Sequence, residues 1–213
     1  MSARAPASHD GTKDQPAAEP GTAIEVVEHL HQTVDEMAEP LARLHAGRMC
    51  CSRGCAACCI DGITVFAVEA AFIRHSAAAV LLEKPHPPGR CAFLAGDESC
   101  RIYPFRPYVC RTQGLPLRYF EPGPEGEVVE FRDICPLNDP HGPPVEHLPE
   151  EQLWVIGPIE GRLAQAQHAF SEDQERVALR DLFTPASVRA SFDGDGEPER
   201  SAGPEGEATP WRR

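Results

Sequence analysis

Residues 51–59 read Cys51-Ser-Arg-Gly-Cys55-Ala-Ala-Cys58-Cys59, so four thiols fall within nine residues. The series continues along the chain with Cys91, Cys100, Cys110 and Cys135. The ninth cysteine, Cys50, lies outside this spacing. Eight patterned thiols indicate disulfides, a metal site or redox catalysis, and the choice among the three decides what the protein does.

The sequence offers little support for disulfides. Residues 1–20 contain no apolar run of the kind that a secretory signal requires, and no segment reaches the roughly 18 apolar residues of a membrane span. We therefore expect a cytoplasmic protein, in which glutathione and thioredoxin keep thiols reduced. In that compartment, thiolate ligation of a metal is the better interpretation of the series.

Charge narrows the possible partners. The formal net charge is −13, from 33 acidic and 20 basic side chains. A chain with this charge repels a phosphate backbone, and the arginines near the cysteines form no basic stripe. We expect a metal ion or cluster as the partner, with no nucleic acid and no membrane, and the sequence identifies no protein partner.

Both ends of the chain are poor in residues that a core could bury. Residues 1–20 and 191–213 consist largely of small, proline and acidic residues, so we expect a disordered tail at the N-terminus and a disordered acidic tail at the C-terminus. The intervening residues 21–190 have the length of a single domain. The cysteine series places the metal-binding core of that domain at residues 49–139.

Hydrophobic periodicity predicts two helices around the first cysteine block. Apolar residues recur at three- and four-residue steps over residues 22–45, which predicts an amphipathic helix with a kink or break at Pro40. After the cysteines, residues 63–66 have the pattern of a short extended segment. A second helix is expected over residues 67–82.

The second half of the chain is expected to contain a hairpin and two further helices. Residues 115–120 and 128–131 flank a Pro/Gly-rich turn, which predicts a small β-hairpin. Residues 153–170 have helical periodicity, bent or truly started by Gly157-Pro158, and a capping-box pattern predicts a last helix over residues 171–182. The sequence therefore predicts a mainly α fold with a small β-hairpin, in which cysteine-rich metal-binding loops lie between helices.

The cysteine spacing suits four-thiolate coordination, which zinc and iron–sulfur clusters both accept. Cys51, Cys55 and Cys58 are close enough to aim their sulfurs at one point, and any of the four later cysteines could complete the shell. Two such sites or one larger cluster are possible. Adjacent Cys58 and Cys59 point in different directions in a helix or a strand, so they would most easily serve two different sites, or one site and the core. The candidate metal ligands are Cys51, Cys55, Cys58, Cys59, Cys91, Cys100, Cys110 and Cys135.

Arg106 and Arg111 lie among the later cysteines. A four-thiolate zinc site or a four-thiolate iron–sulfur cluster carries negative charge, so nearby guanidinium groups are favourable partners. We expect these two side chains to contact the cofactor. A structural salt bridge is the alternative explanation for both.

The pattern resembles the YkgJ-type cysteine-cluster family of zinc- or iron-chelating proteins. The resemblance rests on the block from Cys51 to Cys59, on Val65-x3-Glu69, and on Cys91-x2-Leu94-x5-Cys100-x-Ile-Tyr103-x2-Arg106-Pro107-x2-Cys110-Arg111. It covers roughly residues 45–140. The resemblance implies a bacterial, cytoplasmic metal-binding protein whose reaction, if any, is not established.

Two enzyme families share part of this pattern. Radical S-adenosylmethionine enzymes use the same three-cysteine spacing, but the residues after Cys58 are too few for their usual barrel and do not alternate between strands and helices. Flagellin lysine-N-methylases have a similar cysteine block. The sequence identifies no catalytic residue, and Asp61 and Glu69 are only acidic candidates near the cysteines. The main prediction is a metal-chelating protein. The alternative is an iron–sulfur-dependent redox or methyl-transfer enzyme related to the flagellin methylases.

Overall fold

The computed structural model describes residues 20–171 and 176–184. In these residues the α-helices are α1 (Pro20–Leu44), α2 (Ala67–Ser76), α3 (Ala78–Leu81), α4 (Tyr108–Arg111) and α5 (Pro158–Phe170). The β-strands are β1 (Thr64–Phe66), β2 (Leu117–Pro122), β3 (Val128–Asp133), β4 (Trp154–Val155) and β5 (Arg176–Ala178). Short 3-10 helices occur at η1 (Tyr103–Phe105), η2 (Asp139–His141), η3 (Val145–His147), η4 (Glu150–Gln152) and η5 (Leu179–Phe183).

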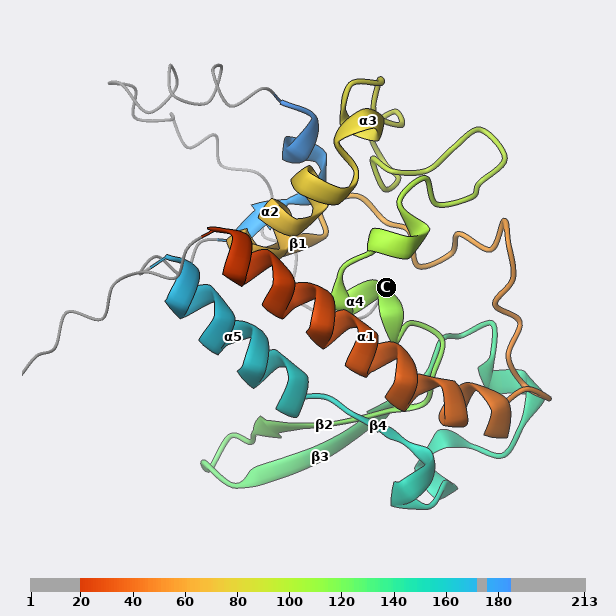
Figure 1. The fold of residues 1–213 in the computed structure, drawn as a ribbon. Coiled ribbons are helices and arrows are strands. Elements are labelled where there is room, and N and C mark those ends of the chain that lie inside the picture. The colour runs from red at the N-terminus through yellow and green to blue at the C-terminus, as the bar shows by residue number, and fades with distance from the viewer. Residues whose placement is uncertain (1–19, 172–175, 185–213) are drawn as a thin grey trace, which may run out of the picture.

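Two helices, α1 and α5, lie side by side along one flank of the molecule (Figure 1). Val27 and Val34 of α1 are both buried and lie on the same face of the helix, as the periodicity predicts. Pro40 lies inside this helix. The predicted N-terminal helix is therefore confirmed, whereas the break considered at Pro40 is not found, because the helix continues to Leu44. For the helix expected over residues 153–170, the alternative that it starts at Gly157-Pro158 is confirmed. α5 begins at Pro158, and the Glu160 side chain accepts a hydrogen bond from Gly157 N–H.

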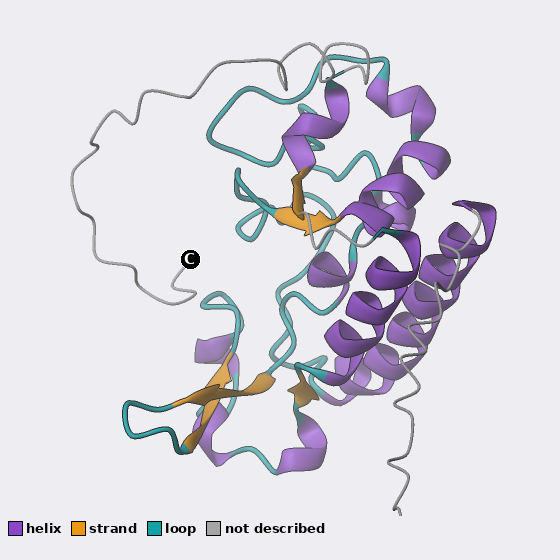
Figure 2. Cartoon of the chain, turned by 90° about the vertical axis from the view of Figure 1, so that its left-hand side faces the viewer, coloured by secondary structure: helices purple, strands orange, loops and turns teal. Residues whose placement is uncertain are grey.

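The strands form two small sheets at separate places in the fold (Figure 2). The extended segment predicted at residues 63–66 is confirmed as β1, which pairs antiparallel with β5. The predicted hairpin is confirmed as β2 and β3, with Tyr119 opposite Phe131. β4 adds to the other edge of β2 in parallel, so the second sheet has the order β3-β2-β4.

The predicted mainly α fold class is wrong. The described residues are 45% helix and 14% strand, which makes the fold mixed α/β. The sequence signal was incomplete because β4 and β5 are only two and three residues long and pair with strands distant in sequence. Strands so short have too little alternation to be distinguished from loop residues.

Two predicted helices also differ from the structure. The helix expected over residues 67–82 is divided at Ala77 into α2 and α3. The prediction of a last helix over residues 171–182 is wrong, because Val177 lies in β5 and the chain then forms the 3-10 helix η5. Tertiary pairing with β1 overrides the local pattern there. Both predicted tails lie outside the described residues, except for Pro20.

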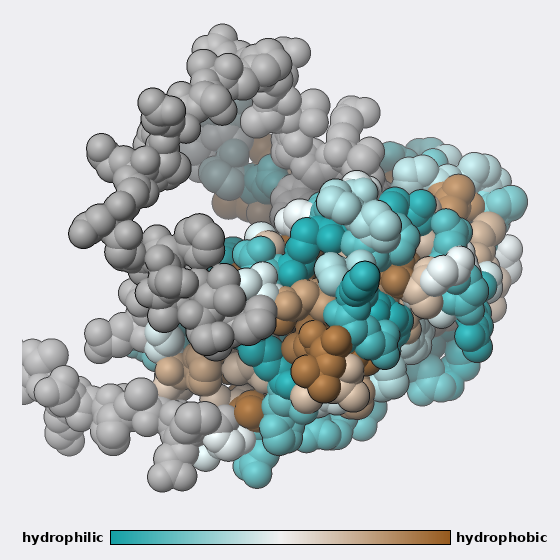
Figure 3. Space-filling model, turned by 90° about the horizontal axis from the view of Figure 1, so that it is seen from above, coloured by the Kyte–Doolittle hydropathy of each residue, from teal (hydrophilic) through white to brown (hydrophobic). Residues whose placement is uncertain are grey.

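The main hydrophobic core joins segments from both halves of the chain. It packs Val27 of α1, Ile73 of α2 and Phe93 against Leu179 and Leu182 of the C-terminal segment. A second cluster forms between α1, α5 and the three-stranded sheet. On the face shown in Figure 3, small hydrophobic patches lie among hydrophilic side chains. No helix in the described residues is long and apolar enough to cross a membrane.

Candidate metal centre

The first cysteine block folds as two consecutive tight turns after α1. Cys55 N–H donates to the Ser52 carbonyl at 2.9 Å, and Cys59 N–H donates to the Ala56 carbonyl at 3.1 Å. Gly54 adopts a positive φ of +87°, a conformation that glycine reaches without a steric penalty. The turns bring thiols of neighbouring positions to the same region, and none of the nine cysteines, all of which lie in the described residues, forms a disulfide.

Four thiols form what we call the interior group, and three of them, those of Cys59, Cys91 and Cys100, pack against the main hydrophobic core. Cys91 N–H donates to the Cys59 carbonyl at 3.0 Å, which joins the first cysteine block to the second. Cys100 is held near Cys91 by an isolated β-bridge to Leu94. The interior group consists of Cys59, Cys91, Cys100 and Cys110.

Electrostatics support the grouping of the interior thiols. Burial raises the pKa of Cys110, and negative charge on Cys91 and Cys100 would raise it further. Burial likewise raises the pKa of Cys91, and negative charge on Cys100 would raise it further. The pKa of Cys59 is raised by a hydrogen bond with Cys58, by burial and by the charges of Cys58, Cys91 and Cys110. These thiols are therefore within range of one another's charge, and burial disfavours the thiolate form of each unless a cation compensates its charge.

A second set of thiols lies nearer the surface, and we call it the surface group: Cys51, Cys55 and Cys135. Cys51 is exposed, Cys55 is half-buried and Cys135 is buried. Burial raises the pKa of Cys51, a hydrogen bond from Asn138 lowers it in part, and the charges of Cys55 and Cys135 raise it. Cys51 and Cys135, the first and last members of the cysteine series, are therefore close enough for their charges to interact.

Asn138 connects the segments that carry the surface group. Its side chain is fully buried, accepts a hydrogen bond from Cys50 N–H at 2.8 Å and donates to the Gly114 carbonyl at 2.8 Å. Its amide nitrogen also lies 3.6 Å from Cys51 Sγ, while its backbone N–H donates to the Cys135 carbonyl. Sequence reasoning missed Asn138, for which the only signal was its position shortly after Cys135.

Cys58 lies between the two groups. Its charge acts on Cys51 in the surface group and on Cys100 and Cys110 in the interior group. The expectation that Cys58 and Cys59 point in different directions assumed a helix or a strand. Cys58 instead lies in a tight turn that Cys59 closes, and the two thiols form a hydrogen bond with each other. Adjacency in the sequence therefore does not decide which site each thiol serves.

The thiols are grouped but not arranged around a common point. Within residues 20–171 and 176–184, no three His, Cys, Asp or Glu side chains lie in a metal-binding arrangement. The donor set nevertheless fits zinc and iron, because both are bound by cysteine thiolates. The assignment of the eight cysteines as metal ligands stays a prediction.

Arg106 and Arg111, the two arginines predicted to contact a cofactor, form salt bridges with α1. Arg111 is buried and donates to the carbonyls of Pro104 and Arg106 at 2.9 Å each, and both arginines pair with Asp35. Arg111 therefore braces the loop between Cys100 and Cys110. Arg106 also lies close enough to Cys100 for its charge to lower the pKa of that thiol, against the larger effect of burial. Cofactor contact by either arginine stays a prediction.

The two acidic candidates have structural partners. Glu69 is buried in α2 and accepts a hydrogen bond from Tyr108 N–H at 2.9 Å, and its carboxylate lies 3.2 Å from His31 Nε2. Asp61 pairs with Arg180, and this pairing is the main cause that lowers the pKa of its carboxyl. Glu69 thus ties α1 and α2 to the start of α4, which carries Cys110.

Comparison with known proteins agrees with the thiol series. Residues 50–136 match the CxxCxxCC family. Its model is described as a "Putative zinc- or iron-chelating domain". The resemblance inferred from the sequence is confirmed over this stretch, which contains all nine cysteines. Searches of curated proteins and of solved structures find no significant match.

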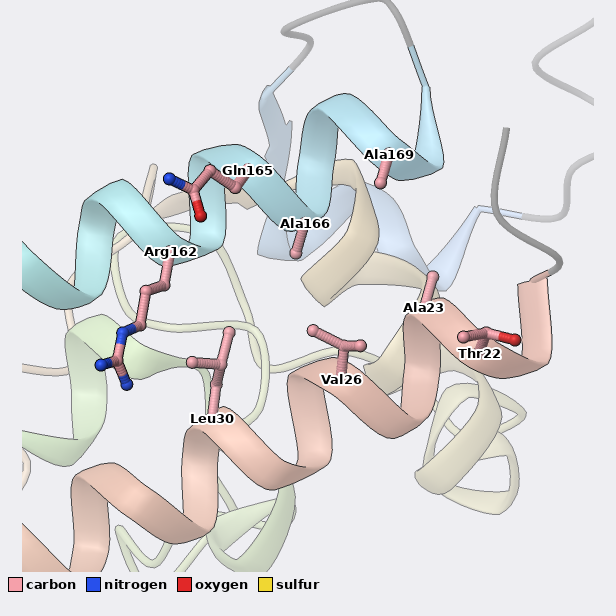
Figure 4. Close-up of a pocket in the computed structure, with 8 residues that line it drawn as sticks. All are labelled: Thr22, Ala23, Val26, Leu30, Arg162, Gln165, Ala166 and Ala169. Atoms are coloured by element: carbon pink, nitrogen blue, oxygen red, sulfur yellow. The ribbon is translucent and has the colours of Figure 1, made fainter. Parts of the chain in front are cut away.

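A groove between α1 and α5 is separate from the cysteine series (Figure 4). Its volume is about 430 Å³, and its lining includes Val26 and Leu30 of α1 and Ala166 of α5, with Arg162 at one end. The lining contains no thiol, carboxylate or imidazole. This groove therefore has no donor that suits zinc or iron.

Proposed function

We propose that this protein chelates zinc or iron through two four-thiolate sites. The interior group supplies one site. The surface group supplies the second, with Cys58 as its fourth ligand. The observation that supports the proposal is the set of hydrogen bonds that bring distant parts of the thiol series together, from Cys91 N–H to Cys59 and from Asn138 to the segments of Cys51 and Cys135.

The proposal requires the thiols to rearrange locally when a metal binds. Rotation about the Cα–Cβ bond moves a cysteine sulfur between staggered positions without moving the backbone. A bound ion holds the thiols as thiolates, so it supplies the charge compensation that isolated buried thiolates lack. Binding is therefore accompanied by proton release, and the reducing conditions of a cytoplasm would keep the ligands available.

The two sites are expected to differ in accessibility. Three thiols of the interior group pack against the main core, and every member of this group is buried or half-buried. Such a closed four-thiolate shell is typical of a structural site. The surface group includes the exposed thiol of Cys51 and lies beside the exposed thiol of Cys50. We therefore infer a structural role for the interior site and metal exchange with the surroundings at the surface site.

The experiment is anaerobic purification followed by metal analysis and a visible spectrum. We expect about two zinc or iron centres per chain if both shells fill with single ions. A colourless zinc protein and the broad visible absorbance of an iron–sulfur cluster are readily distinguished. An iron–sulfur centre would leave redox chemistry open as the alternative function. Folded, metal-free protein with eight freely titrating thiols would sink the proposal.

Cysteine variants assign the ligands to the two sites. Cys110→Ser should remove metal from the interior site and Cys55→Ser from the surface site, each with the other site retained. Cys50→Ser is the matched control, because Cys50 lies next to the series without belonging to its spacing, and its metal content should stay unchanged. Equal losses in all three variants would show that the two-site assignment is wrong.

A further inference from the structure

Arg180 makes an unusually dense set of contacts with the backbone around the interior group. The residue lies in η5, far beyond residues 50–136 that match the family. Its guanidinium donates to the carbonyl of His86 at 2.7 Å, of Pro87 at 3.3 Å and of Arg90 at 2.8 Å. All three carbonyls belong to the loop that leads directly into Cys91.

The same guanidinium holds the other side of the interior group. Its Nε donates to both carboxylate oxygens of Asp61, at 2.9 and 3.1 Å. Asp61 follows Cys59 by two residues, and its carboxylate also accepts a hydrogen bond from Gly89 N–H at 2.9 Å. Arg180 thus joins the segment after Cys59 to the segment before Cys91, where the two backbones already meet through the Cys91–Cys59 hydrogen bond.

The C-terminal segment that carries Arg180 is firmly placed on the core. β5 pairs with β1, and Leu179 N–H donates to the Ile63 carbonyl at 2.9 Å. Leu179 and Leu182 are buried, and the Phe183 ring packs against Phe93 with centroids 4.9 Å apart. The guanidinium therefore acts from a fixed position, with its planar set of donors suited to several acceptors at once.

We propose that Arg180 is a positioning residue that clamps the Cys59 and Cys91 segments and so slows metal release from the interior site. This inference rests on the proposed function. A metal leaves a four-thiolate shell only when ligand-bearing segments separate, which is a local opening of the fold. The clamp opposes that opening because separation of the two segments breaks its charge-assisted hydrogen bonds.

The matched control is Arg176, which lies on the same C-terminal segment. Arg176 donates to the Thr64 side chain and carbonyl and stacks over Phe66, so it secures β5 without touching either cysteine segment. Arg180→Gln and Arg176→Gln therefore remove the same charge from the same segment. Only the first removes contacts with the thiol-bearing backbones.

The experiment measures Zn²⁺ release to a chelator from full-length protein, with Cys55→Ser in the background so that the interior site is observed alone. We expect Arg180→Gln to speed release on the order of tenfold or more, since several charge-assisted hydrogen bonds are lost. Alkylation of Cys91 and Cys59, mapped by mass spectrometry, should rise in parallel. Arg176→Gln should behave as the parent protein.

A lysine variant and a second substitution keep the test independent of global folding. Arg180→Lys keeps the charge beside Asp61 but cannot reach all the carbonyls, so its release rate should fall between those of the parent and Arg180→Gln. Asp61→Asn should speed release, and adding it to Arg180→Gln should cause less than the product of the two effects.

Two results would overturn the clamp. One is a parental release rate in Arg180→Gln, and the other is equal acceleration in Arg180→Gln and Arg176→Gln, which would indicate a general weakening of the C-terminal segment. Both leave the proposed function intact. A parent protein that binds no Zn²⁺ would instead reject the proposed function itself.

Discussion

At the scale of single residues, the surface group depends on a close approach between Gly114 and Cys51. Gly114 adopts a φ of +96°, and a Cβ at this position would lie 2.5 Å from Cys51 Sγ and 3.2 Å from the Asn138 amide nitrogen. Both the backbone conformation and the missing side chain are therefore needed. Asn138 then fixes the distance between the Gly114 and Cys51 segments through its buried amide.

Gly114→Ala is expected to destabilise the protein and to weaken metal binding at the surface site. The left-handed backbone costs a non-glycine residue about 1–2 kcal/mol, and the added methyl group must also displace the Cys51 thiol. Gly126→Ala is the control, because Gly126 in the turn between β2 and β3 also has a positive φ, of +84°, with nothing within 4 Å of its added Cβ. Chemical denaturation and zinc titration measure the two effects. Equal zinc affinity in both variants would contradict the steric argument.

At the scale of elements, α1 stabilises the second cysteine block through one carboxylate. Asp35 pairs with Arg106 and Arg111, and Arg111 in turn holds two carbonyls of the loop between Cys100 and Cys110. Burial lowers the pKa of Arg111, and the Asp35 charge opposes that shift. The helix therefore positions a loop that is distant in sequence.

Asp35→Asn should destabilise the protein by about 1–3 kcal/mol, because it leaves the buried Arg111 guanidinium without its counter-charge. The half-exposed position of Asp35 keeps the expected loss below that of a fully buried pair. Glu39→Gln on the same helix is the control. Its partner Arg43 is exposed, so its loss should stay within about 0.5 kcal/mol. Urea unfolding measures the loss of stability in each variant. Similar losses in Asp35→Asn and Glu39→Gln would contradict the role of Asp35 as the counter-charge of a buried arginine.

Elements with strong local patterns were predictable from the sequence. The period of α1 and the turn between β2 and β3 are local features, and both were found where expected. The pairing of β5 with β1 and of β4 with β2 was not predictable, because no local pattern encodes contacts between distant segments. The same limit applied to the site. The thiol spacing was visible, whereas Asn138 and Arg180 act only through contacts that the fold creates.

At the scale of the whole molecule, part of the thiol series belongs to the main hydrophobic core. Cys59, Cys91 and Cys100 pack with residues from α1, α2 and the C-terminal segment. Apart from α2 and the β2–β3 hairpin, the chain between Met49 and Asp139 lies mostly in loops and short turns, and the two longest helices of the described residues, α1 and α5, lie outside it. Packing and metal ligation are therefore expected to stabilise the same region.

Removal of the metal should make residues 49–139 sensitive to proteases before the flanking helices α1 and α5. Thiolate sites contribute on the order of 10 kcal/mol of binding free energy, which becomes folding free energy when the metal-free site is disordered. Holo and chelated samples would be digested in parallel and the cuts mapped by mass spectrometry, with readdition of Zn²⁺ to the chelated sample as the control. We expect protection to return with zinc. An unchanged cleavage pattern after chelation would mean that the backbone contacts of Asn138, Arg111 and Arg180 already hold the thiols in place. The metal centre would then sit on a preformed scaffold, which favours exchange or transfer of the metal over a structural role.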